Sequence, residues 1–177
     1  MARIHITGAS GTGVSTLGRA LAEVIAVPCH DTDDVFWLPT DPPYAQARPI
    51  PDRLALLDQQ LGETWVLAGS LDGWGDNLIP RFDLVIFLRA PTALRLARLR
   101  RREREAFGFA LDPGGAMHDA HEAFIEWAAA YDVTQTGRNF ARDLAWLDTL
   151  PCLVLHLDGS EPVPALVDEA LKHVRQL

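Results

Sequence analysis

Lysine is nearly absent from this sequence, because Lys172 is the only one among 16 basic residues. Cysteine is scarce as well. Cys29 and Cys152 lie too far apart in sequence to form a metal-ligand pair by themselves, and each adjoins an apolar run. We therefore expect two buried thiols rather than a disulfide framework, which favours a reducing, cytoplasmic location.

Long apolar segments and a positive balance of charge are also missing. No stretch has the length of a membrane-spanning helix, and we expect neither a signal peptide nor a membrane partner. The formal net charge of −8 disfavours a general nucleic-acid binder. Internal repeats and low-complexity tracts are absent from the sequence. The 177 residues, 48 % of them hydrophobic, suit one domain over residues 1–177. Nothing in the sequence indicates an oligomeric state.

Apolar runs alternate with segments of helical period along the chain. We expect strands near residues 3–7, 29–31, 65–68, 84–88 and 153–157, separated by helices near 17–24, 52–61, 92–105, 118–131, 137–147 and 163–174. The strands are continuously apolar, as in a parallel sheet that is covered on both faces. The pattern predicts an α/β fold with three layers, α/β/α, around a central parallel sheet of about five strands.

A glycine-rich stretch joins the first strand to the first helix. Its glycines have the spacing G-x-x-x-x-G of a phosphate-binding P-loop, and glycine lets consecutive backbone N–H groups turn toward an anion. We expect the whole stretch to bind a nucleotide, with Ser15 also in a metal-binding role. The stretch comprises Gly8, Ala9, Ser10, Gly11, Thr12, Gly13, Val14, Ser15 and Thr16.

The loop departs from the P-loop pattern at Val14, where lysine is usual. That lysine reaches the β- and γ-phosphates, and valine cannot supply its charge. The scarcity of lysine in this chain does not explain the substitution. If lysine had generally been replaced by arginine, position 14 would hold arginine instead of valine. Either other cations substitute for it, or phosphoryl transfer has been lost.

Three further segments make the chain similar to P-loop kinases of the adenylate-kinase-like group, which includes the shikimate kinases. They are residues 82–91 with the arginines that follow, residues 155–163, and the acidic run Asp31-Thr32-Asp33-Asp34. The resemblance implies a P-loop NTPase fold, ATP and Mg²⁺ as cofactors, a small-molecule or nucleotide acceptor, and a helical lid over residues 103–137. Gly159 would lie in the adenine-side loop.

The same resemblance implies roles for the acidic run. Asp31 would help Ser15 to hold Mg²⁺, while Asp33 would bind the acceptor hydroxyl and take its proton. Asp34 would bind the acceptor, or replace Asp33 in that role. Alternatively, the run merely caps the segment that follows it.

Arginines are concentrated in the helix that enters the predicted lid and occur again just after the lid. Arg98 and Arg102 are four positions apart on one helical face, and by the resemblance they contact the nucleotide. Arg138 and Arg142 are also four positions apart. By the resemblance, they lie on one helix after the lid, beside the transferring phosphate. Arg95, Arg100 and Arg104 fit a solvated helix face better. For His118 and His121, a solvated or capping role is favoured over a metal site.

The acceptor pocket is the least defined part of the prediction. Gly69 would let the backbone approach a substrate, and Trp74 would either line the pocket with Trp37 and Arg48 or fill the core. A kinase is the function that these patterns favour. The alternative is a non-catalytic nucleotide-binding protein that uses lid closure as a switch.

Overall fold

The structure is a computed structural model that describes residues 2–177. Five parallel strands form its sheet, in the spatial order β2-β3-β1-β4-β5. Their bounds are β1 Arg3–Gly8, β2 Cys29–Asp31, β3 Trp65–Ala68, β4 Leu84–Arg89 and β5 Leu153–Asp158. The predicted central parallel sheet is confirmed.

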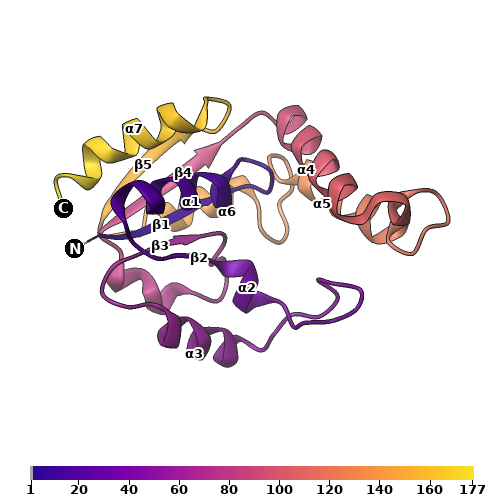
Figure 1. Ribbon diagram of the computed structural model, residues 1–177, viewed down its shortest axis with the longest axis horizontal. Helices are drawn as coiled ribbons and strands as arrows, with labels where there is room; N and C mark the ends of the chain where they lie inside the picture. Colours follow the sequence, from indigo (N-terminus) through magenta and orange to yellow (C-terminus); the bar gives the residue numbers. More distant parts are fainter. Residues whose placement is uncertain (1) are drawn as a thin grey trace.

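Helices cover both faces of the sheet, as the continuous apolar runs predict (Figure 1). Ile4, Ile6 and Ile86 face a core closed by the helices α1 and α7, whereas Leu67 and Val85 face a second core beneath α3 and α6. The three-layer α/β/α architecture is therefore confirmed. The α-helices are α1 Val14–Ile25, α2 Thr32–Phe36, α3 Ile50–Gln60, α4 Thr92–Phe107, α5 His118–Ala130, α6 Phe140–Leu147 and α7 Val163–Val174.

α4 and α5 form a pair that extends away from the sheet (Figure 1). A small apolar cluster, centred on Leu99, Ile125 and Ala128, joins the two helices. A short 3₁₀ helix, Gly108–Leu111, follows α4 at the tip of the pair. This pair contains most of the predicted lid, residues 103–137.

Several expectations about exposure are wrong in detail. Cys29 and Cys152 are half-buried, and burial raises the pKa of both thiols. His121 is buried rather than solvated, with its Nδ1 3.6 Å from a carboxylate oxygen of Glu103. None of the helices in the described part of the chain is long and apolar enough to cross a membrane.

Candidate functional site

The P-loop connects the end of β1 to the start of α1 at the carboxyl edge of the sheet. Gly11 and Gly13 have φ angles of +85° and +103°, a region that residues with a Cβ rarely adopt. Gly13 is the N-cap of α1, which begins at Val14. The two glycines thus permit the tight turn that sends the chain from strand into helix.

Backbone amides gather on this loop without partners. The loop closes on itself through Thr12, whose N–H and hydroxyl both donate to the carbonyl of Ala9. Within residues 2–177, the N–H groups of Gly11, Gly13, Val14 and Ser15 donate to no acceptor. Unpaired amides at a helix N-terminus suit an anion, and the dipole of α1 adds to the attraction.

Val14 contributes packing rather than charge. Its side chain is 9 % exposed and belongs to the apolar core between the sheet and α1. The P-loop of this chain therefore has no cationic side chain of its own, and any cation near its amides must come from another element.

Ser15 and Asp31 lie together, although 16 positions separate them in sequence. Ser15 Oγ donates to Asp31 Oδ2 at 2.5 Å, since α1 begins beside the end of β2. Oδ1 of Asp31 accepts the N–H of Asp33 at 3.0 Å and so caps α2. The capping alternative is therefore part of the structure, and it coexists with the contact to Ser15. Hydroxyl and carboxylate oxygens are the donors that Mg²⁺ prefers.

Asp33 lies in the first turn of α2, next to that pair. The surrounding protein desolvates its carboxyl group, and this effect, followed by the charge of Asp31, raises the pKa of Asp33. Arg102 and Arg138 are near enough to oppose the shift. A carboxyl group with a raised pKa and access to solvent suits proton transfer.

Three of the predicted acceptor residues line one hollow of about 320 Å³, namely Asp34, Trp37 and Arg48. The hollow is formed by the loop after α2, which folds back through an antiparallel bridge from Trp37 to Ala47. Arg48 braces that loop by donating to the carbonyls of Val35 and Trp37. The other residues that line the hollow are Leu38, Pro39, Thr40, Pro43 and Tyr44.

Gly69 and Trp74 do not line the hollow. Glycine at position 69 leaves room for the side chain of Thr32, because a Cβ there would lie 1.9 Å from Thr32 Oγ1. Trp74 is buried in the core, and its indole N–H donates to the carbonyl of Ser70. Of the two alternatives for Trp74, the structure has the core residue.

Arg98 ties the P-loop to the turn after β5. Its Nη1 donates to the carbonyls of Thr12 at 3.2 Å and Gly159 at 2.9 Å. Gly159 itself packs on the loop, since a Cβ there would lie 2.6 Å from the carbonyl oxygen of Thr12. Arg102, one turn further along α4, is 64 % exposed and pairs with Glu103 at 3.5 Å.

Arg138 and Arg142 do not share a helix, contrary to the prediction. Asn139 caps α6 by accepting the N–H of Arg142, so the helix begins at Phe140 and Arg138 precedes it. Arg138 is 13 % exposed and donates to the carbonyl of Gly8 at 2.8 Å, whereas Arg142 is 50 % exposed and pairs with Asp72.

The buried carboxylate of Asp143 also holds Arg138 in place. Its Nη2 lies 3.1 Å from Asp143 Oδ2, which also accepts the hydroxyl of Tyr131 at 2.5 Å. Burial, followed by the charge of Asp143, raises the pKa of Tyr131 and keeps its hydroxyl protonated. Arg138 is thus a fixed cation at the start of the P-loop.

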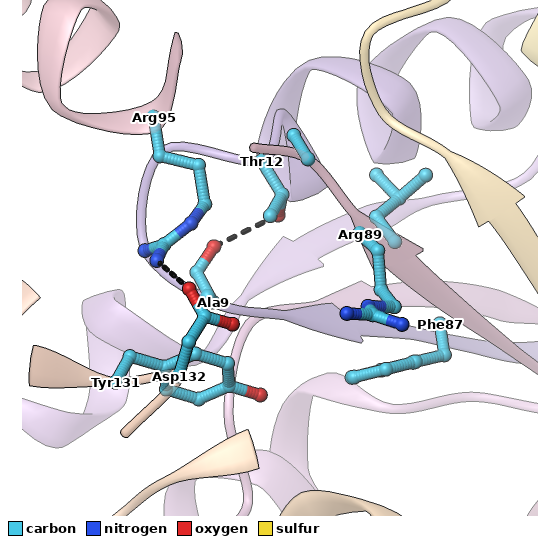
Figure 2. Close-up of a pocket in the computed structure, with 9 residues that line it drawn as sticks. Ala9, Thr12, Phe87, Arg89, Arg95, Tyr131 and Asp132 are labelled. Carbon is cyan, nitrogen blue, oxygen red and sulfur yellow. Dashed lines mark hydrogen bonds and ion pairs between the residues drawn. The ribbon is translucent and has the colours of Figure 1, made fainter. Parts of the chain in front are cut away.

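Two buried arginines were missed by the sequence analysis. Arg95, predicted to be solvated, is 1 % exposed and pairs with Asp132 (Figure 2). The signal for Arg95 was its place four residues before the buried Leu99, on the inner face of α4. Arg53 is buried against Phe36, with its guanidinium carbon 3.7 Å from the ring centroid.

Arg53 has no carboxylate partner among the described residues. The only hydrogen bond of its guanidinium group there is from Nε to the carbonyl of Arg48, and desolvation lowers the pKa of Arg53. Groups of three or more His, Cys, Asp or Glu that could hold a metal are absent from residues 2–177. A cation bound by Ser15 and Asp31 would complete its coordination with water and with phosphate oxygens of a nucleotide.

Solved structures with the same architecture include a shikimate kinase and a gluconokinase. The chain superposes on a shikimate kinase from Acinetobacter baumannii in complex with shikimate with a TM-score of 0.59, at 14 % identity, covering 99 % of this chain and 94 % of that one. A gluconokinase from Sinorhizobium meliloti gives 0.53 at 19 % identity, with 99 % and 92 % covered. At these identities the likeness shows the fold, which is that of the P-loop kinases.

Sequence similarity defines the family more narrowly. The chain is 40 % identical over 174 residues to the uncharacterized protein YqaC of Bacillus subtilis (strain 168), covering 97 % of this chain and 96 % of that protein. It belongs to the family of YqaC. No model of a known protein family matches the chain.

Proposed function

We propose that the protein is a phosphotransferase that moves the γ-phosphoryl group of ATP to a hydroxyl group of a small acceptor. The observation that carries the proposal is the juxtaposition at the carboxyl edge of the sheet. Unpaired P-loop amides, the Ser15–Asp31 contact and Asp33 come together there from three different segments. Such crevices are where open α/β sheets bind ligands.

In this proposal the phosphates of ATP bind to the unpaired amides of Gly11, Gly13, Val14 and Ser15. Ser15 and Asp31 would hold Mg²⁺, which when bound neutralises charge on the phosphates and polarises them toward attack. The Ser15–Asp31 contact of 2.5 Å fits this role, because it presents two oxygen ligands at the edge of the cradle. Arg98 and Gly159 would define the nucleotide side, and Arg102 would approach the phosphates with the predicted lid.

Asp33 would orient the acceptor hydroxyl and take its proton as the new phosphate ester forms. Its raised pKa supports this role, since a stronger base accepts a proton more readily. The acceptor would occupy the hollow lined by Asp34, Trp37 and Arg48.

Val14 favours a second candidate function, that of a nucleotide-binding switch without catalysis. The P-loop supplies no cation of its own to the γ-phosphate. Closure of the predicted lid would then report nucleotide binding to a partner. Retention of Asp33 beside the Ser15–Asp31 pair supports the enzyme, because a binder needs no base.

The test compares Asp33→Asn with Asp34→Asn, the alternative position for the base on the same short helix. With MgATP and a pool of small acceptors, Asp33→Asn should lower turnover by about two orders of magnitude or more, the scale for a positioned base. Calorimetry should find its MgATP affinity within a few-fold of wild type. Wild-type turnover in Asp33→Asn, with loss in Asp34→Asn, would transfer the role to Asp34.

A further inference from the structure

Arg95 is a buried cation directly beside the P-loop. Its Nη1 donates to the carbonyls of Ser10 and Ala128, both at 3.2 Å. Its Nη2 lies 2.8 Å from Asp132 Oδ2 and 3.2 Å from the hydroxyl of Thr92. Figure 2 shows the guanidinium directed at Asp132, alongside the loop. Burying a guanidinium is costly unless such partners surround it.

These partners belong to three separate segments. Ser10 is in the P-loop, Thr92 is the first residue of α4, and Ala128 and Asp132 lie at the end of α5. α4 leads into the predicted lid and α5 returns from it, so Arg95 joins both legs of the helical pair to the loop. The backbones also meet here, because a Cβ on Gly11 would lie 2.6 Å from the carbonyl oxygen of Arg95.

The contact with Ser10 has a consequence for the amide that follows it. The carbonyl of Ser10 and the N–H of Gly11 belong to one planar trans peptide group and point in opposite directions. Holding that carbonyl toward Arg95 therefore directs the N–H of Gly11 away from it. Arg98 acts likewise on the peptide between Thr12 and Gly13. Gly11 and Gly13 contribute two of the unpaired amides of the cradle.

We propose that Arg95 is a positioning residue that orients the P-loop amides and couples them, through Asp132, to the α4–α5 pair. Arg95 is too deeply buried to contact a ligand, so it acts only through the loop. The proposal rests on the proposed function only in taking phosphate as the ligand of the loop. In a P-loop without lysine, this buried cation also contributes positive potential behind the amides.

Coupling of this kind has a thermodynamic signature. A change at Asp132, on the α5 side, should reach the loop mainly through Arg95, and otherwise through Thr92, whose hydroxyl donates to Asp132 Oδ2 at 2.5 Å. The effects of Arg95→Met and Asp132→Asn on the loop should then be strongly non-additive, since the second change loses its main route to the loop once the guanidinium is gone.

The experiment uses two readouts on the full chain. Nuclear magnetic resonance of the nucleotide-free protein follows the amide shifts and solvent-exchange rates of Gly11 and Gly13, and calorimetry measures the affinity for magnesium tripolyphosphate. Arg95→Met should move both amides and weaken binding by about tenfold, within the usual range of coupling. Asp132→Asn should do so less, and Arg95→Lys should recover part of the loss.

The double variant decides whether coupling runs through Arg95. It should bind no more weakly than Arg95→Met alone. Arg81→Met is the control, because it breaks an exposed ion pair with Asp58 that includes no P-loop residue. It should leave both amides unchanged.

Unchanged amides and affinity in Arg95→Met would overturn the proposal, as would additive effects in the double variant. If wild type binds neither tripolyphosphate nor MgATP, the proposed function fails, while the amides of the nucleotide-free protein still decide the positioning role. If Arg95→Met does not fold, Arg95→Lys and Asp132→Asn decide by the same readouts, since they retain the cation.

Discussion

Replacing Arg138 by alanine removes the cation that lies closest to the start of the P-loop. The resemblance implied that Arg138 and Arg142 both lie beside the transferring phosphate, where a cation could offset the missing lysine. Only Arg138 contacts the loop, at 2.8 Å from the carbonyl oxygen of Gly8. Arg142 is instead paired with Asp72. We therefore expect Arg138→Ala to impair phosphoryl transfer far more than Arg142→Ala does.

The size of the effect follows from the role of such a cation. An arginine that stabilises charge on a transferring phosphoryl group contributes about 10³ in rate or more. That factor corresponds to about 4 kcal/mol of transition-state stabilisation. Arg138→Ala should therefore lower turnover about a thousandfold, and Arg142→Ala by no more than a few-fold. Val14→Lys should restore part of the activity of Arg138→Ala.

Stability must be separated from catalysis, because Arg138 also neutralises Asp143. Breaking a buried ion pair costs about 3–5 kcal/mol, so Arg138→Ala should lower Tm by about 6–20 °C. Asp143→Asn breaks the same pair and keeps the cation. It should lose stability but keep most of its turnover.

The assay measures ADP formed from MgATP with a pool of acceptors, at a temperature where all variants are folded. Equal turnover in wild type and Arg138→Ala would refute the reasoning. Equal losses in Arg138→Ala and Asp143→Asn would show that the effect is structural.

Three other predictions concern the folded state. MgATP at a hundred times its Kd should stabilise the protein by about 2.7 kcal/mol, raising Tm by several degrees in a thermal melt; an unchanged Tm, with no heat of binding, would remove the nucleotide site. The pKa of Asp33 is raised in the folded protein, so ionisation of Asp33 costs more in the fold than in the unfolded chain. Asp33→Asn should therefore raise Tm at pH 7, and this gain should vanish toward pH 4, where the carboxyl group becomes protonated in both states. Burial lowers the pKa of His5 from 6.5 to about 4, so the unfolded chain alone takes up a proton between these values. Urea titrations should show a fall of up to about 3 kcal/mol in the free energy of unfolding on acidification, which His5→Gln abolishes.

The fold was predictable because its signals are local and periodic. Continuous apolar strands and amphipathic helices indicate the three layers and the parallel direction of the strands. The glycine spacing locates the P-loop. The resemblance to P-loop kinases implied that Ser15 would meet Asp31, and the two side chains are in contact. Topology supports this placement, because the carboxyl ends of parallel strands lie along one edge of the sheet.

Contacts between side chains were harder to predict. Arg95 looked solvated because charged residues usually are, and only its long-range partners Ser10 and Asp132 make burial tolerable. The start of α6 depended on the cap at Asn139, which separated Arg138 from Arg142. Helix caps and long-range ion pairs depend on which residues meet in the folded protein. The spacing of residues along the sequence does not reveal these contacts.

Phosphorus NMR tests the central claim most directly. Wild-type protein is incubated with ATP, Mg²⁺ and a pool of small hydroxyl-bearing acceptors, including ones with a carboxylate or phosphate group. The account predicts one new phosphate-ester resonance that grows as ATP is converted to ADP. If MgATP binds but no acceptor is phosphorylated, the account of a phosphotransferase is contradicted and the nucleotide-binding switch takes its place.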